Sequence, residues 1–204
     1  MPKDYDKTHS CILESAKKEF LEKGFVNANL REISKNAGVT TGGLYRHFPD
    51  KEAVFAALVN PVLEEFHRQA DIFKARDYDL MEQDSLDVMW ESGVDLSLIF
   101  HMVYQNFDEF KLLLCCSEGT QYAGFIHDFV MMEQRETLAF LEAARTRGVQ
   151  VKNIHPEELH LLLSAYVSAV FEVVVHDFTQ EAAQHYLKTL KTFFNPGWRA
   201  VLGL

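Results

Sequence analysis

Hydrophobic residues recur at helical spacing along most of the chain, and no stretch alternates as a strand would. The pattern therefore predicts an all-α fold. The expected helices cover, in order, residues 6 or 8 to 23, 30–37, 40–47, 50–74, 86–106, 107–116, 120–147, 156–176 and 179–195. Residues 75–85 are charged and weakly periodic, which indicates a connection, and Asn195-Pro196-Gly197 is expected to end the last long helix.

Residues 29–48 are expected to form two short helices joined by a tight turn. Asn29 is a suitable N-cap for the first helix, and Gly38 can stop it because glycine adopts positive φ without a Cβ clash. Thr40 is an N-cap candidate for the second helix, in which Leu44 and Phe48 point inward. Two short helices with a glycine turn and a polar outer face describe a helix-turn-helix.

The run AGVTTGGLYRHFPDKE at residues 37–52 resembles the signature of the TetR/AcrR family of transcriptional repressors, in which AGVS, a glycine, LYxHF and a lysine recur. The resemblance covers about the first quarter of the chain. It implies an N-terminal three-helix DNA-binding domain over residues 6–66 and a C-terminal helical effector-binding and dimerisation domain over 67–204. Gly43 departs from the family, which more often has Thr or Ala there, at a cost of roughly 1 kcal/mol in helix propensity.

The outer face of the second short helix supplies the candidate contacts to double-stranded operator DNA. The set is Thr40, Thr41, Gly42, Gly43, Tyr45, Arg46, His47 and Lys51. Thr41 and Arg46 are candidates for base contacts, and Gly42 allows close backbone approach. The other polar members would mainly hold phosphates, which sets position and supplies salt-dependent affinity. Asn27 and Asn29 either reach a phosphate or only cap and turn the chain.

The net charge of −10 at first argues against nucleic acid as a partner, but the charge is unevenly distributed. Residues 1–51 hold nine Lys or Arg against seven Asp or Glu, whereas the rest holds eleven against 23. The excess of acid therefore lies outside the expected DNA-binding segment.

The composition and the first residues of the chain bear on where the protein is located. No apolar run is expected to reach the roughly 18 to 20 residues of a membrane span, and the polar start MPKDYDKTHS shows no signal peptide. The three cysteines, of which two are adjacent, fit no disulfide framework. These features predict a cytoplasmic protein without a membrane partner.

Motifs for catalysis are missing from the sequence. It has no Walker loop, dinucleotide GxGxxG, HExxH, CxxC or nucleophile elbow. His155 and His160, or His127 next to Asp128, do not supply the three or four ligands that a metal site requires. We therefore expect no enzyme activity, no cofactor and no metal.

Aromatic residues and methionines are dense between Met89 and Met132. Most must form core, but an adaptable Met- and Phe-rich cavity also suits a sensor of apolar small molecules. The candidate effector pocket comprises Trp90, Phe100, Tyr104, Tyr122, Phe125, Phe129 and Glu172. Glu172 and Asp128 are the nearest charges able to orient a polar or cationic group.

Polar residues recur every four positions on the penultimate helix, at His160, Ser164, Ser168, Glu172 and His176. This stripe must face water, a cavity or another subunit, and the residues alone leave these alternatives open. The resemblance implies a homodimer formed through the last two long helices. The candidate dimerisation residues are Ser164, Ser168, Tyr186 and Leu190.

Together, these expectations predict a homodimeric repressor that a small apolar effector releases from a palindromic operator. The helix over 50–74, with Pro61 as a flexing point, is expected to carry the change from pocket to DNA. The alternative is a helical small-molecule carrier or scavenger without a regulatory DNA role.

Overall fold

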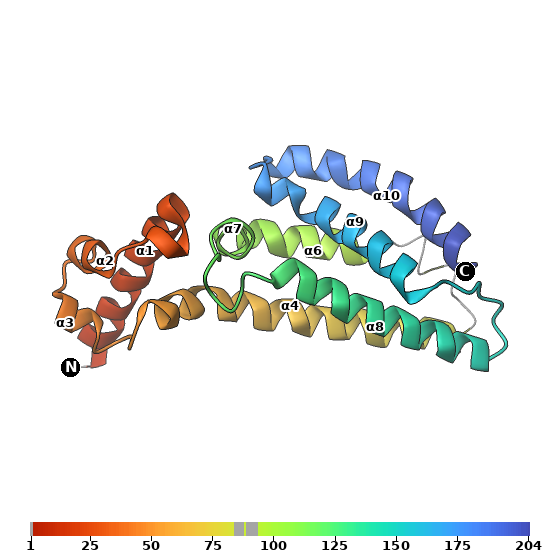
Figure 1. Cartoon of the computed structure of the whole chain (residues 1–204), viewed down its shortest axis with the longest axis horizontal. Coiled ribbons are helices and arrows are strands. Elements are labelled where there is room, and N and C mark those ends of the chain that lie inside the picture. The colour runs from red at the N-terminus through yellow and green to blue at the C-terminus, as the bar shows by residue number, and fades with distance from the viewer. Residues whose placement is uncertain (1, 84–87, 89–93) are drawn as a thin grey trace. The chain divides into compact units, whose positions relative to one another are not determined.

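The computed structural model describes residues 2–83, 88 and 94–204, and every regular element in this part of the chain is a helix (Figure 1). The all-α prediction is confirmed. The helices are α1 (Pro2–Asn27), α2 (Leu30–Asn36), α3 (Thr41–Leu44), α4 (Lys51–Glu82), α6 (Val94–Gln105), α7 (Phe107–Cys115), α8 (Phe125–Thr146), α9 (Pro156–Val175) and α10 (Gln180–Leu202). The first part of the helix expected over 86–106 lies outside the described residues.

The helices divide into two compact units. Unit 1 contains Met1–Glu65 and Asn106–Ala123, and unit 2 contains Phe66–Gln105 and Gly124–Leu204. Helix α4 contributes its first part to unit 1 and the remainder to unit 2. The expected boundary lies between residues 66 and 67. In the structure Phe66 belongs to unit 2, and residues 106–123 belong to unit 1 because α7 packs on α1.

Three phenylalanines form the centre of unit 1. The ring centroids of Phe20, Phe25 and Phe55 lie 5.2 to 5.9 Å apart, and Phe20 and Phe55 are fully buried. Gly24 has a φ of 71° and interrupts α1 just before this cluster, close to its expected end. Glycine accepts this conformation at little cost, so Phe25 can turn back onto Phe20.

The segment of residues 106–123 is held to α1 by several contacts. Phe110 of α7 is fully buried, and Lys17 of α1 forms an ion pair with Glu109 of α7. The backbone N–H of Phe25 donates to the carbonyl oxygen of Cys116 over 2.8 Å. Unit 1 thus consists of the helix-turn-helix, α1, the first part of α4 and a short helix from much later in the chain.

Long helices make up most of unit 2. Helices α8, α9 and α10 follow one another in antiparallel directions (Figure 1). A second aromatic cluster joins three of the helices, with Phe66 of α4 4.8 Å from Phe129 of α8 and 6.2 Å from Phe171 of α9. Phe66 and Phe171 are buried.

Helix α4 continues to Glu82, beyond the expected end near Lys74. The residues expected to form a connection are helical because they pack within unit 2. Met81 is buried, and the ring of Tyr78 lies 5.4 Å from that of Phe140. Charge and weak periodicity concealed this packing in the sequence.

Two other helix ends differ from the prediction. Helix α8 begins at Phe125 because the hydroxyl of Thr120 accepts from Tyr122 N–H and donates to a carbonyl, which makes a turn of the preceding residues. Helix α10 passes through Pro196 and ends at Leu202, where Gly203 has a φ of 80°. Lys152 holds this end, since its N–H donates to the Leu202 carbonyl over 2.7 Å.

Helix α9 has the length and apolar composition of a membrane span. This corrects the expectation that no segment of the chain approaches such a span. Seven of its residues are buried within the protein, including Leu159, Val167 and Phe171. Core helices of globular proteins meet the same criteria, and α9 packs one face against α8 and α10 within unit 2.

Candidate functional site

Helices α2 and α3 form the helix-turn-helix, and side-chain caps fix both of their starts. The Asn29 side chain accepts from Arg31 N–H over 2.9 Å, and the Thr40 hydroxyl accepts from Gly43 N–H over 3.0 Å. Gly38 has a φ of 71°, as its expected role in the turn requires. The side-chain amide of Asn27 donates to a carbonyl of α1. Both Asn29 and Asn27 thus make hydrogen bonds at helix ends within the chain.

Helix α3 is shorter than expected, with Leu44 as its last residue. The backbone after Leu44 turns more tightly than an α-helix. Arg46 N–H donates to the Gly43 carbonyl and His47 N–H donates to the Leu44 carbonyl, each three residues earlier in the chain. Leu44 and Phe48 are buried, as their spacing predicts. Their burial directs the intervening residues outward.

The outer face of α3 and the following turn is open. Gly42, Tyr45 and Arg46 are exposed, whereas Thr41 is half-buried with its hydroxyl 3.3 Å from that of Ser34. Within the described parts of the chain, the Arg46 guanidinium makes no hydrogen bond or ion pair. Its planar set of donors therefore faces solvent, ready for a base edge or a phosphate.

The two glycines of α3 have different surroundings. A Cβ atom at Gly42 would have no atom within 4 Å, whereas one at Gly43 would lie 3.2 Å from the hydroxyl oxygen of Thr40. A side chain at Gly43 would therefore require the Thr40 hydroxyl to shift by a few tenths of an ångström. The protein's own packing does not explain Gly42, whose exposed backbone is open to close approach by a partner.

His47 lies in a stack of rings at the end of the helix-turn-helix. Its ring centroid is 4.1 Å from that of Tyr5 and 5.6 Å from that of His9, both on α1. Its Nδ1 atom is buried without a hydrogen-bond partner among the described residues. Burial, followed by the charge of His9, lowers the pKa of His47. The neutral imidazole is therefore favoured near neutral pH.

Lys51, at the start of α4, binds the turn between α1 and α2. Its Nζ atom donates to the carbonyl oxygens of Phe25 (2.6 Å), Val26 (3.1 Å) and Ala28 (3.1 Å). It also lies 4.5 Å from the centre of the Phe25 ring. All three donors of the ammonium are occupied, so the geometry favours a structural role for Lys51.

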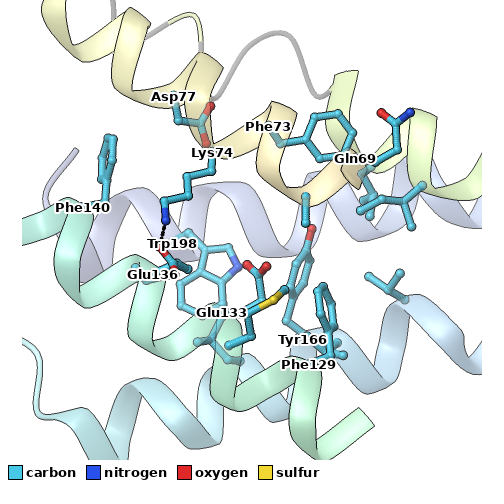
Figure 2. A pocket seen from close by; sticks show the side chains of 18 of the residues that line it. Gln69, Phe73, Lys74, Asp77, Phe129, Glu133, Glu136, Phe140, Tyr166 and Trp198 are labelled. Carbon is cyan, nitrogen blue, oxygen red and sulfur yellow. Dashed lines mark ion pairs between the residues drawn. The ribbon is translucent and has the colours of Figure 1, made fainter. Parts of the chain in front are cut away.

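Unit 2 contains a cavity of about 410 Å³ between α4, α6, α8, α9 and α10. Figure 2 shows side chains from α4, α8, α9 and α10 converging on it. The labelled residues are Gln69, Phe73, Lys74, Asp77, Phe129, Glu133, Glu136, Phe140, Tyr166 and Trp198. Lys74 and Glu136 form an ion pair, which raises the pKa of Lys74 and lowers that of Glu136. This volume lies in the range of about 300–1,000 Å³ typical of small-molecule sites.

Among the predicted effector residues that the structure describes, Phe129 lines this cavity. Phe100 is buried in the core, and Phe125 is buried beside Phe66 with their ring centroids 5.7 Å apart. Neither phenylalanine lines the cavity, because both are occupied in core packing. Trp90 lies outside the described residues.

The polar members of the predicted effector set also have other surroundings. The Tyr104 hydroxyl donates to the Phe178 carbonyl over 2.9 Å. Tyr122 belongs to unit 1, where its hydroxyl donates to Asn60 over 2.7 Å. Glu172 is exposed and pairs with the histidine one turn later, 2.9 Å away. Among the described members of the predicted set, the density of aromatic residues thus identified one lining residue, Phe129.

One signal in the sequence could have located the α8 wall of the cavity. Phe129, Glu133, Glu136 and Phe140 follow the i, i+4, i+7, i+11 spacing of one helix face. Acidic residues between aromatic residues on an inward face are unusual for core. The contributions of Tyr166 and Trp198 depend on tertiary packing and carry no such signal.

The predicted dimerisation residues divide into buried and exposed groups. Leu190 is buried, and the Tyr186 hydroxyl donates to a carbonyl of α9 over 3.2 Å. Ser164 is half-buried, with its hydroxyl bonded to the His160 carbonyl, whereas Ser168 is exposed. Leu190 and Tyr186 thus pack within the subunit.

An exposed helix-turn-helix in one unit and a cavity in another all-helical unit define the class of helix-turn-helix DNA-binding regulators. The family model described as "Bacterial regulatory proteins, tetR family" matches residues 12–58. The HTH-type transcriptional regulator SAB2452 of Staphylococcus aureus is 31% identical over 188 residues, which cover 83% of this chain and 98% of that protein. The chain belongs to the tetR family of bacterial regulatory proteins, as its motifs indicate.

Solved structures show the same fold. NalD, the secondary repressor of the MexAB-OprM multidrug efflux pump in Pseudomonas aeruginosa, superposes with a TM-score of 0.58 at 22% identity. The likeness covers 92% of this chain and 95% of that one. A putative TetR-family regulator from Mesorhizobium loti gives a TM-score of 0.55 at 17% identity, over 98% of both chains. At these identities the likeness concerns the fold alone.

We expect Lys51→Met to reduce the free energy of unfolding by about 1–2 kcal/mol, since three carbonyls lose a charged donor. Chemical denaturation measures this loss. The matched control is Lys18→Met, which changes an exposed lysine of α1. A variant with wild-type stability but a salt dependence of DNA binding reduced by about one unit would instead assign Lys51 to a phosphate.

We expect the free energy of unfolding to fall as pH falls from about 7.5 to 5.5, and His47→Phe to reduce this fall. The pKa of His47 is lower in the folded protein than in the unfolded chain, so the unfolded chain takes up the proton first. The phenyl ring preserves the stack on Tyr5. Denaturation at several pH values tests this, with His185→Phe, at an exposed histidine of α10, as the control. An unchanged pH dependence in His47→Phe contradicts the assignment.

Proposed function

We propose that this chain is a ligand-responsive transcriptional repressor that binds a palindromic operator as a homodimer in the cytoplasm. A small, mostly apolar molecule in the unit 2 cavity releases it from the DNA. The open outer face of α3 is the observation that carries the DNA-binding part. Gly42 and Arg46 are exposed there without an internal packing role or partner among the described residues.

The contacts on DNA divide by chemistry. Arg46 presents a guanidinium that matches the O6 and N7 acceptors of guanine in the major groove. Thr41 is a second candidate for base contact, and Gly42 permits close approach of the backbone. Tyr45, Thr40 and the neutral His47 supply hydrogen bonds to phosphates, while Lys51 holds the turn beside the helix-turn-helix.

Dimerisation is inferred from operator geometry and from exposed apolar side chains. One helix-turn-helix reads one half-site, and half-sites are centred about 34–36 Å apart, so two copies must be held together. Leu161 of α9 is 69% exposed and Phe193 of α10 is 75% exposed. On α9, Ala165 and Ser168 continue the line of Leu161 at helical spacing and are also exposed. We assign the interface to these faces.

Release from DNA requires a connection from the cavity to unit 1. Helix α4 provides one, because it lines the cavity with Phe73 and Lys74 and contributes its first part to unit 1. The segment of residues 106–123 provides two more, because it belongs to unit 1 while its neighbours in sequence, α6 and α8, line the cavity. A ligand that shifts α6 or α8 would therefore displace residues 106–123, which are held to α1. Coupling of about 1–3 kcal/mol corresponds to a roughly 5- to 150-fold loss of operator affinity.

We expect Arg46→Ala to weaken operator binding by about 1–3 kcal/mol, or roughly 5- to 150-fold, because a bidentate base contact is lost. Fluorescence anisotropy with DNA from upstream of the protein's own gene measures the affinity. Lys188→Ala, at an exposed lysine of α10, is the control and should bind as the wild type does. Wild-type affinity in Arg46→Ala contradicts the base contact. If the wild-type protein binds no DNA, the carrier alternative replaces the regulator.

We expect Phe193→Glu to convert the dimer to a monomer, because a carboxylate would be buried in the interface. Light scattering at micromolar concentration measures the oligomeric state, and circular dichroism checks the fold. The matched control is Gln184→Glu, which adds the same charge to an exposed position of α10 nine residues earlier, on the opposite side of the helix. A wild-type monomer, or a Phe193→Glu variant that remains dimeric, refutes this interface.

A further inference from the structure

We propose that Tyr5 of α1 positions His47 for operator binding, because its ring holds the imidazole so that Nε2 faces solvent and can donate to a phosphate of the DNA. The inference rests on the proposed function, since it takes His47 as a phosphate contact. It adds to the DNA-binding surface a residue from outside the helix-turn-helix, which precedes the residues 12–58 that match the family model.

Tyr5 lies at the start of the apolar face of α1. This face, at i, i+4, i+7, i+11 and i+15, contains Tyr5, His9, Ile12, Ala16 and Phe20. The last three are fully buried in unit 1, whereas Tyr5 is 50% exposed. The face therefore extends beyond the core, and its first residues meet the turn after α3 (Figure 1). A half-exposed tyrosine contributes little to the core, so burial alone does not explain its position.

Two rings of α1 pack on the two residues that end the helix-turn-helix. The Tyr5 ring stacks on the His47 imidazole, with their centroids 4.1 Å apart and their planes 25° from parallel. One helical turn later, the His9 ring stacks on Phe48 at 4.7 Å. Phe48 is buried, so the second stack anchors this segment while the first restricts rotation of the imidazole. The His47 side chain is thus oriented from α1.

The two nitrogen atoms of His47 have different surroundings. Nδ1 is buried without a partner, whereas Nε2 has access to solvent and makes no hydrogen bond within the described parts of the chain. A neutral imidazole carries one proton, and a buried N–H without an acceptor is costly. The proton is therefore favoured on Nε2, which becomes a donor directed out of the protein. Phosphate oxygens are acceptors for such a donor.

Orienting the imidazole before DNA binds has an energetic consequence. A side chain that rotates freely in the free protein must lose this freedom at an interface, which weakens association. The stack on Tyr5 imposes the order in advance, so more of the hydrogen-bond energy contributes to affinity. Loss of this orientation, and with it part of a hydrogen bond to a charged group, corresponds to about a five- to tenfold loss of affinity.

The first test compares two substitutions of Tyr5 in the full chain, with DNA from upstream of the protein's own gene as the probe. Tyr5→Phe keeps the ring and should bind as the wild type does. Tyr5→Leu removes the flat surface but keeps an apolar side chain, and it should bind about five- to tenfold more weakly in fluorescence anisotropy. The matched control is Ser10→Leu, which adds the same leucine to an exposed position on another face of α1. Equal losses in Tyr5→Phe and Tyr5→Leu would assign the effect to the hydroxyl and overturn positioning by the ring.

A double-mutant cycle tests whether Tyr5 acts through His47. His47→Phe keeps a ring for the stack but has no N–H to donate to a phosphate. In this background Tyr5→Leu should cause no further loss of affinity. A loss as large as the one in the wild-type background would mean that Tyr5 acts on another contact or on the fold, and it overturns the assignment. Circular dichroism verifies that each variant is folded under the conditions of the binding assay.

The pKa of His47 provides a readout that does not involve DNA. Burial lowers this pKa, and the Tyr5 ring covers one side of the imidazole, so Tyr5→Leu should raise the pKa toward its ordinary value. Tyr5→Phe should leave it unchanged, and His9, which also faces His47 from α1, is present in both variants. NMR titration of the free protein measures the pKa, with the spectrum of His47→Phe identifying the signal. An unchanged pKa in Tyr5→Leu overturns the inference.

The wild-type affinity for the operator separates this inference from the proposed function. Weaker binding by Tyr5→Leu, with no further loss in the His47→Phe background, supports both. If the wild type binds the operator and Tyr5→Leu binds equally well, the proposed function stands and the positioning role fails. A wild-type protein that binds no DNA overturns both.

Discussion

The ammonium group of Lys51 and the aromatic ring beneath it fix the turn on which the helix-turn-helix depends. The group binds the carbonyls of Phe25, Val26 and Ala28, and α2 begins two residues after Ala28. The first residue of α4 is thus tied to the residues that position α2. A displacement of Lys51 is therefore transmitted to the helix-turn-helix through these hydrogen bonds and the few residues that separate them from α2.

A buried carboxylate supports the same turn from the other side. Glu19 is 5% exposed, accepts from Lys23 and also accepts from the backbone N–H of Asn29 over 3.1 Å. Burial alone would raise the pKa of this carboxyl, but the bonds from Lys23 and Asn29 outweigh that effect and lower it. Asn29 is therefore held by Glu19 while it caps α2, so the entry to the helix-turn-helix has little freedom to rotate.

Local chemistry determined which features the sequence could predict. A cap or a turn depends on a few neighbouring residues, and the roles of Asn29, Gly38 and Thr40 were recognisable for that reason. The continuation of α10 through Pro196 was not predictable in this way, because it depends on tertiary packing beyond the proline and not on neighbouring residues. The lining of the cavity was harder still, since Glu133 and Trp198 lie 65 positions apart and meet only through the packing of α8 and α10. Helical periodicity assigns a residue to a face, but it does not identify the element that the face meets.

Many residues of a folded protein must satisfy the packing of the fold and the recognition of a partner at the same time. The open space around Gly42 removes the first of these requirements. A side chain at this position would encounter no atom of the protein, so the fold places few restrictions on its size or charge. Sequence changes there would alter what the regulator recognises without first weakening its scaffold. Gly42 is thus a natural starting position for evolution, or a designed library, to redirect the protein to a new set of promoters.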